Sequence, residues 1–276
     1  MPKAKSVIKK RAATKTAVNR SADKKPSKAP AARMSLEETM KALEKAGSAQ
    51  TRKTYARHGA AEPMFGVKFG DLKKLLDRIK VDQELAEALW ETGNFDARNL
   101  AAKVCDPANF PPKVLDGWAA TPIAWTWGGY VGQIAAEGPQ GRAKAEKWLG
   151  AKDDAMRSAG WCAVSAMAMV DEATPDSWFA DRLGEIEKGM ASVNNRHRSL
   201  MNSALIAIGC RNATLRKAAA GVAKRLGKIE VDHGDTACKT ADAVESMDKR
   251  WERAKARGFE SPAAQERSME SMRTRC

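Results

Sequence analysis

The sequence NFDAR, residues 94–98, combines a typical start of a helix with a cation one turn into it. Asn94 is a residue type that caps helix N-termini, and Arg98 follows four positions later. The same pattern, Asp or Asn first and Arg four positions on, recurs in DDAMR (153–157) and NNRHR (194–198). The successive arginines are 59 and 41 residues apart, and helix-pair repeats have a period of about 40 residues. The pattern predicts stacked helix pairs, with an accidental spacing of surface arginines as the alternative.

The remainder of the chain also has the periodicity of α-helices. SLEE (35–38) contains a capping box, with Ser35 as the N-cap and Glu38 three positions on. In residues 71–80 the apolar side chains recur every three or four positions, with lysines between them. Glycines and prolines divide the chain into about a dozen segments, and no run alternates β-branched and polar residues as a strand would. We therefore predict an all-α fold, an α-solenoid of HEAT-like helical repeats, over residues 34–258.

The two ends of the chain differ in composition from this segment. Residues 1–33 hold eleven of the 48 Lys and Arg residues and a single acid, Asp23, so they carry +10 of the net charge of +14 and leave +4 for the rest. With little apolar surface to bury they cannot offset the entropy of ordering, so we predict a disordered basic tail that binds nucleic acid without sequence preference. A solubility tail or a transit peptide is the alternative. Residues 259–276 are predicted to form a charged, loosely ordered C-terminal tail.

Composition argues against several classes of protein. The apolar fraction is 43%, enough for a core, but no run approaches the roughly 20 apolar residues of a membrane span. No apolar stretch follows the basic N-terminus, as a secretory signal would require. The five cysteines are scattered and form no CxxC pair, so we expect reduced thiols and no metal site. The composition favours an intracellular protein without membrane contact. We expect a cytoplasmic monomer, nucleoid-associated if bacterial.

The arginines of the repeated pattern fall near predicted helix starts. Free backbone N–H groups and the helix dipole favour anions at that end of a helix. Stacking would align these ends into a ridge that follows a phosphate backbone. The residues predicted to hold DNA phosphates are Arg98, Arg198, Lys68, Lys73 and Lys74.

An aromatic stretch, AWTWGGYVG (124–132), lies between the first two of these arginine patterns and contains Trp125 and Trp127. Farther along, Arg157 and Trp161 are four residues apart, so we predict that they share a helix face and form a cation–π pair. Tryptophans beside arginines suit contact with sugars or base faces of nucleic acid. The alternative is packing between helices, which we expect for Trp90, Trp118, Trp148 and Trp178.

Residues 63–107, PMFGVKFGDLKKLLDRIKVDQELAEALWETGNFDARNLAAKVCDP, resemble the N-terminal half of the AlkD-like DNA alkylation repair proteins, part of the superfamily of HEAT-like repeat DNA glycosylases. The resemblance is carried by the GVK…LKKL, LA…LW.TG and ARNLA segments. WL…DDAMRSAGW (148–161) resembles the family's next functional helix, and KIEVDHGDTACKTADA (228–243) resembles a C-terminal loop of one branch. The similarity extends over residues 35–250 as a pattern.

The resemblance implies a superhelix of helix pairs whose basic concave face holds duplex DNA. It implies excision of cationic N3- and N7-alkylated purines without base flipping, metal or organic cofactor. Tryptophans would contact the deoxyribose, and an Asp four residues after the first of them would stabilise positive charge on the sugar. On this sequence the resemblance places Arg157 and one tryptophan, Trp127 or Trp125, at the site. We predict Trp127 and Arg157 as the catalytic residues, and Trp125, together with Trp161 beside Arg157, as the sugar contacts.

The sequence departs from the family's pattern at the carboxylate. Gly129 or Val131 stands where the Asp should be, depending on which tryptophan is aligned, and residues 199–209 lack the family's later Trp. Loss of one electrostatic stabiliser costs about 10²–10³-fold in rate, and Asp96 and Asp116 are the acids that could replace it. We predict a duplex-DNA-binding alkylation-repair protein whose glycosylase activity the missing Asp would weaken or abolish. The alternative is a non-catalytic HEAT-like scaffold that binds a protein partner or binds DNA structurally.

The segment 232–238 combines carboxylates with His233 and Cys238, residue types found in metal sites and in Cys/His nucleophiles. Its spacing matches no ligand template, and Asp and Gly also suit an ordered turn. We favour the ordered turn.

Overall fold

The computed structural model describes residues 33–122, 127–234 and 236–275, and it leaves out the side chains of residues 127 and 128. The predicted basic tail therefore lies outside the described residues except for its last residue, and Trp125 lies outside them too. The described residues form fourteen α-helices and no β-strand, which confirms the all-α prediction. The helices are α1 (Leu36–Ala46), α2 (Ala49–Arg57), α3 (Phe69–Ile79), α4 (Gln83–Glu91), α5 (Phe95–Val104), α6 (Pro112–Ala120), α7 (Trp127–Glu137), α8 (Gly141–Leu149), α9 (Asp154–Val170), α10 (Asp176–Gly189), α11 (Asn195–Gly209), α12 (Ala213–Leu226), α13 (Ala243–Ala256) and α14 (Pro262–Arg267).

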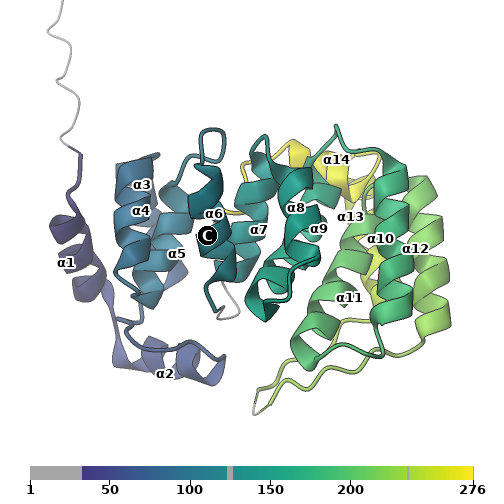
Figure 1. The fold of residues 1–276 in the computed structure, drawn as a ribbon, viewed down its shortest axis with the longest axis horizontal. Coiled ribbons are helices and arrows are strands. Elements are labelled where there is room, and N and C mark those ends of the chain that lie inside the picture. Colours follow the sequence, from purple (N-terminus) through teal and green to yellow (C-terminus); the bar gives the residue numbers. More distant parts are fainter. Residues whose placement is uncertain (1–32, 123–126, 235, 276) are drawn as a thin grey trace, which may run out of the picture. The chain divides into compact units, whose positions relative to one another are not determined.

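The helices of residues 34–276 stack as pairs in two layers (Figure 1). The inner layer is a row in which α5 packs on α7, α7 on α9, α9 on α11 and α11 on α13. The outer layer contains α4, α6, α8, α10 and α12, which pair with the inner helices. Because α7 lies between α5 and α9, the 59-residue interval between the first two arginine patterns spans two repeats. No helix in the described part of the chain is long and apolar enough to cross a membrane.

The repeated pattern that opens the inner helices is a set of N-caps, as predicted. The Asn94 side chain accepts hydrogen bonds from the backbone N–H groups at the start of α5, 2.9 and 3.1 Å long. Asp153 caps α9 at 2.7 Å and Asn194 caps α11 at 2.9 Å. Ser35 and Glu38 form the predicted capping box of α1. Caps satisfy N–H groups that a helix leaves without partners, so they fix where each inner helix begins.

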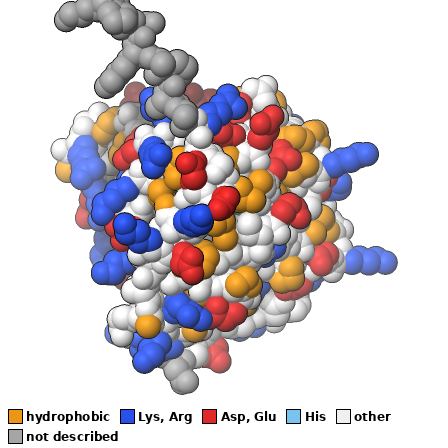
Figure 2. Space-filling model, turned by 90° about the vertical axis from the view of Figure 1, so that its left-hand side faces the viewer, with side chains coloured by type: hydrophobic (Ala, Val, Ile, Leu, Met, Phe, Trp, Pro, Cys, Tyr) orange, Lys and Arg blue, Asp and Glu red, His pale blue; other side chains and the backbone are white. Residues whose placement is uncertain are grey.

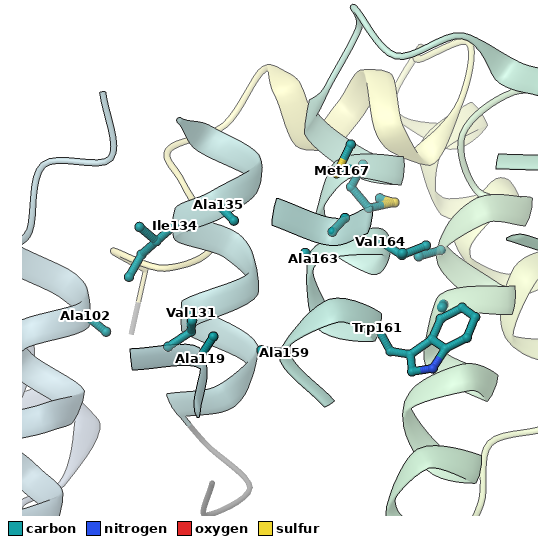
Figure 3. Packing of buried hydrophobic residues seen from close by; sticks show 14 of the residues in the cluster. Ala102, Ala119, Val131, Ile134, Ala135, Ala159, Trp161, Ala163, Val164 and Met167 are labelled. Carbon is teal, nitrogen blue, oxygen red and sulfur yellow. The ribbon is translucent and has the colours of Figure 1, made fainter. Parts of the chain in front are cut away.

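Alanines, glycines and tryptophans fill the space between the layers. The ring of Trp90 stacks on that of Trp118 with centroids 4.0 Å apart, and the four tryptophans expected in helix packing, Trp90, Trp118, Trp148 and Trp178, are at most 5% exposed. Small residues let α7 approach α9 closely (Figure 3). A Cβ added at Gly132 would lie 2.5 Å from the backbone N of Ala163, so only glycine permits this packing distance.

The predicted C-terminal tail is instead part of the folded body. Its helix α14 packs against α9 and α13. Arg273 is 5% exposed and donates hydrogen bonds to the carbonyl oxygens of Ala102 and Lys103, 2.7 and 2.6 Å away, and it pairs with Glu137. Those carbonyls belong to the last turn of α5, where a helix has acceptors without intrahelical donors. The charges of this segment therefore cap α5, which composition alone could not reveal.

Candidate nucleic-acid interface

The N-termini of α9 and α11 meet at one edge of the stack. The Nδ2 group of Asn194 donates to Oδ1 of Asp154 over 2.9 Å, and Nε2 of His197 lies 3.2 Å from the Asp154 carbonyl oxygen. His197 is 2% exposed, so this contact joins the two helices internally. We call the N-terminal edge the first turns of α5, α9 and α11, which the repeated caps begin.

Arg157, the residue assigned to assist catalysis, lies at this edge in the first turn of α9. Its Nη2 atom is 3.3 Å from Oδ1 of Asp154, and 41% of its side chain is exposed. Its buried Nε has no hydrogen-bond partner among the described residues. The sequence analysis did not predict Asp154 as a partner of Arg157, because the neighbouring Asp153 is the residue that fits the capping pattern. The guanidinium is accessible, but a neighbouring carboxylate already offsets part of its charge.

Two arginines predicted to bind phosphate hold parts of the protein together. The Nε of Arg98 donates to the carbonyl oxygen of Trp90 over 3.2 Å, and its guanidinium lies over the Trp90 ring. Burial lowers the pKa of Arg98 from its ordinary value. Arg198 donates to the carbonyl oxygens of Glu230 and Val193 over 3.2 and 3.3 Å. The structure therefore gives both arginines a structural role, which their spacing did not indicate.

The three predicted lysines lie around the first turns of α3. Lys68 is exposed and immediately precedes α3, next to the residues that contact the N-terminus of α5. Lys73 forms an ion pair with Asp77, and Lys74 forms one with Asp71 at 2.7 Å. Figure 2 shows that Lys and Arg are mixed with Asp and Glu on this end of the stack. This end of the stack therefore carries both positive and negative side chains. Lys68 remains the strongest candidate among the three lysines for binding a phosphate.

Trp161 does not form the predicted surface platform. It is 8% exposed and belongs to the core, and its ring extends from α9 on the side away from Val131 and Ala119 (Figure 3). No cation–π contact joins it to Arg157 among the described residues. The two residues share a helix face, but Trp161 lies one turn deeper, where packing covers its ring. The sugar-contact assignment of Trp161 is therefore wrong for this structure.

The two positions considered for the missing carboxylate differ in accessibility. Val131 is fully buried in α7, whereas Gly129 is exposed. A Cβ at Gly129 would meet no atom of the described residues within 4 Å. An acid at Val131 would lose its hydration in the core, whereas one at Gly129 would keep it. Of the two positions on α7, only position 129 is therefore open to a ligand, and its residue is a glycine without a side chain.

The acids suggested as replacements have other partners. Asp96 is fully buried, and its carboxylate accepts backbone N–H groups of residues 65, 66 and 67 at 2.6, 2.9 and 2.8 Å. Asp116 accepts from the indole N–H of Trp148 at 2.8 Å and pairs with Lys144 and Lys147. Neither carboxylate is free to face a sugar, so the structure excludes both suggestions.

Five cations that sequence reasoning missed form no ion pair and no side-chain hydrogen bond within the described part of the chain. They lie on α2, before α9, at the start of α11 and in the segment after α12: Lys53, Arg57, Lys152, Arg196 and Lys239. The sequence offered a signal for some of them, since α2 contains no acid and Arg196 belongs to NNRHR. Cations without internal partners gain most from an external anion.

Residues 228–242, which we call the crossing loop, connect α12 to α13 and carry the DHGDTACK sequence. Asn195 of α11 donates to the carbonyl oxygen of Asp232 over 2.6 Å and accepts its N–H over 2.8 Å. The Asp232 carboxylate accepts the N–H of Gly234, whose φ of +57° suits glycine. Thr240 accepts the N–H of Val231 and lies 3.2 Å from Nε2 of His233. The favoured ordered turn is present here, fixed to the start of α11.

A two-layered stack of helix pairs whose capped inner helices begin at one edge defines an α-solenoid of the HEAT-like class. A family model for DNA alkylation repair enzymes matches residues 39–247, and the chain belongs to this family. The family expected from residues 63–107 is thereby confirmed.

Relatives of known sequence and structure agree with this assignment. An uncharacterized protein of Listeria innocua is 29% identical over 78% of this chain and 95% of its own, and one of Listeria monocytogenes is 29% identical over 80% and 97%. A solved structure superposes with a TM-score of 0.74 at 30% identity, covering 83% of this chain and 98% of its own. It represents a family related to the HEAT-like repeat DNA glycosylases with affinity for branched DNA structures.

Proposed function

We propose that this chain binds DNA along its N-terminal edge and that its glycosylase activity is weak or lost. The observation that carries the proposal is the set of five cations without internal partners on α2, around the starts of α9 and α11, and in the crossing loop. The partial positive charge of the helix dipole at these helix starts adds to their attraction for phosphates. A cluster of such cations suits a polyanionic ligand. Membership of the DNA alkylation repair family supports DNA as that ligand.

The loss of excision follows from the side chains that the site contains. The cationic N3- and N7-alkylated purines are good leaving groups, so a glycosylase of this type depends on a carboxylate near the sugar. Gly129 occupies the open position on α7, and Asp96 and Asp116 are held by structural bonds. Asp154 is 50% exposed but shares its charge with Arg157. We assign Arg157 to a phosphate rather than to a catalytic step.

An excision assay tests the chemistry separately from binding. DNA containing N7-methylguanine and N3-methyladenine is incubated with the protein, and released base is measured by chromatography. We expect no more release than from the Arg157→Ala variant. The Gly129→Asp variant should release more base than Gly129→Asn, which matches it in size without the charge. Release by the natural protein well above Arg157→Ala would overturn the proposed loss of activity.

A binding assay tests the DNA partner. We expect the monomer to bind both a linear duplex and a four-way junction of the same sequence, with the junction bound more tightly, in line with the affinity of the solved relative for branched DNA. Fluorescence anisotropy gives both dissociation constants, and sedimentation gives the oligomeric state. Failure to bind either DNA at 50 mM salt, where phosphate contacts are strong, would contradict the proposal and favour a protein-binding scaffold.

A further inference from the structure

The acids of α13 lie on one side of the helix, toward α12. Asp248 of α13 forms an ion pair with Arg216 of α12 at 2.7 Å, and the Arg216 guanidinium lies 4.9 Å from the centre of the Trp251 ring. Glu245 precedes Asp248 by three residues and Glu252 follows it by four, so the three carboxylates of α13 share a side. The rest of the exposed surface of α13 is therefore left without an acid of its own.

The other exposed side of α13 carries three arginines, which we call the arginine line. Arg250, Arg253 and the C-cap Arg257 recur at intervals of three and four residues, and all three are exposed. Burial raises the pKa of the Cys210 thiol to about 11, and the positive charge of the nearby Arg250 opposes this effect. The side chains of Arg253 and Arg257 form no hydrogen bond or ion pair with any residue that the structure describes. The arginine line therefore has charge available for an external anion.

The arginine line is distant from the N-terminal edge. The indole N–H of Trp251, a residue between Arg250 and Arg253, donates to the carbonyl oxygen of Gly209 over 2.8 Å. The line therefore begins level with the last residue of α11, whereas the first turn of α11 belongs to the N-terminal edge. The 15 residues of α11 rise about 1.5 Å each, so the two surfaces lie roughly 20 Å apart. A phosphate held at one surface does not reach the other.

We propose that the arginine line binds the phosphates of a second arm of a branched DNA while the N-terminal edge holds the first arm. The proposal rests on the proposed DNA binding and names the residues that favour the branched form. Guanidinium groups stay charged at neutral pH and present paired N–H donors that match the oxygens of a phosphate. The acids of α13 lie on its other side, where Asp248 already has a partner, so they do not compete for these guanidinium groups.

A pair of double variants tests this surface on two DNAs. Arg253→Ala with Arg257→Ala removes two charges from the arginine line, and the matched control, Lys224→Ala with Lys255→Ala, removes two charges from exposed positions outside it. Thermal denaturation followed by circular dichroism verifies that both variants are folded. The probes are a four-way junction and a linear duplex with the sequence and length of one of its arms. Fluorescence anisotropy at several salt concentrations gives the dissociation constant and the salt slope for each DNA.

The arginine line predicts a loss that is specific to the junction. At about 150 mM salt the arginine variant should bind the junction about tenfold or more weakly, with a salt slope reduced by roughly 2. The single-arm duplex, which the N-terminal edge holds alone, should change less than about twofold, and the control should bind both DNAs as the natural protein does. An unchanged affinity for the junction would overturn the assignment, and so would an equal loss for the two DNAs or in the control. Absence of DNA binding by the natural protein would instead contradict the proposed function itself.

Discussion

Single buried polar residues fix the geometry of the N-terminal edge. The carboxylate of Asp96 accepts three successive backbone N–H groups and thereby shapes the segment 65–67 that joins α2 to α3. A carboxylate that is fully buried is stable only when its oxygens have donors, and these N–H groups have no better acceptor. The residue that looked like a candidate acid in the sequence is therefore a scaffold for α2.

Replacing Asp96 should destabilise the protein strongly. We expect Asp96→Ala to lower the free energy of unfolding by about 3 kcal/mol or more, because three N–H groups lose a charged acceptor. Urea denaturation at pH 7 measures the change. Asp77→Ala removes an exposed acid from the same region and should cost less than about 1 kcal/mol. Equal losses in the two variants would contradict the role given to Asp96.

Arg273 has the corresponding role at the other end of α5. We expect Arg273→Ala to cost about 3 kcal/mol, since it leaves Glu137 and two buried carbonyl oxygens without their donor. Arg253→Ala, at an exposed position of α13, should stay within about 0.5 kcal/mol of the natural protein. Urea denaturation of both variants checks this, and a small loss for Arg273→Ala would show that residues 259–276 do behave as a loose tail.

At the scale of elements, the inner helices depend on close approach. The helix α7 carries Gly132 against α9 and Gly129 toward solvent, so two glycines one turn apart serve different purposes. The crossing loop depends on side chains of α11, so the inner row also fixes the position of this loop. The start of α11 therefore positions a functional element in addition to its own cap.

The two glycines of α7 give a matched pair of substitutions. Gly132→Ala should lower the melting temperature because its Cβ would overlap the backbone of α9, which must then move. Gly129→Ala should be neutral or stabilising by up to about 1 kcal/mol, because alanine is the better helix former and the site is open. Thermal denaturation followed by circular dichroism compares them. Similar melting temperatures would contradict the close α7–α9 packing.

At the scale of the whole molecule, the distribution of charge matters more than its total. The net charge is +14, yet the conspicuous arginines of the inner helices are partly engaged with protein groups. Five of the cations without internal partners among the described residues lie on α2, in the crossing loop and around the starts of α9 and α11. DNA binding should therefore depend on these local cations rather than on any exposed lysine.

The salt dependence of binding should reveal this distribution. Each phosphate contact contributes about 0.9 to the slope of log K against log salt concentration, so the Lys53→Ala, Arg57→Ala double variant should reduce the slope by roughly 2. Lys113→Ala with Lys217→Ala removes the same charge from exposed positions of α6 and α12 in the outer layer. This control should keep the natural slope in anisotropy titrations. A parallel reduction in the control would indicate attraction by net charge alone.

The sequence by itself determined the helical class, the repeat and the family. Caps such as Asn94, Asp153 and Asn194 act through bonds within a few residues, so local sequence specifies where inner helices begin. Apolar periodicity specifies that they stack. The absence of an acid in the first turns of α7 could also be predicted from the sequence, because the prediction depends only on residue spacing along one helix.

Only the tertiary structure decided which charged and aromatic side chains face a ligand. Trp161 is buried by α9's neighbours, Arg198 is held by a carbonyl 32 residues away, and Arg273 caps a helix 170 residues earlier. These partners are distant in sequence, and exposure depends on what packs over a residue rather than on its type. The position of α2 relative to the crossing loop is of the same kind, since residues 57 and 238 line one cavity although they are far apart in the sequence.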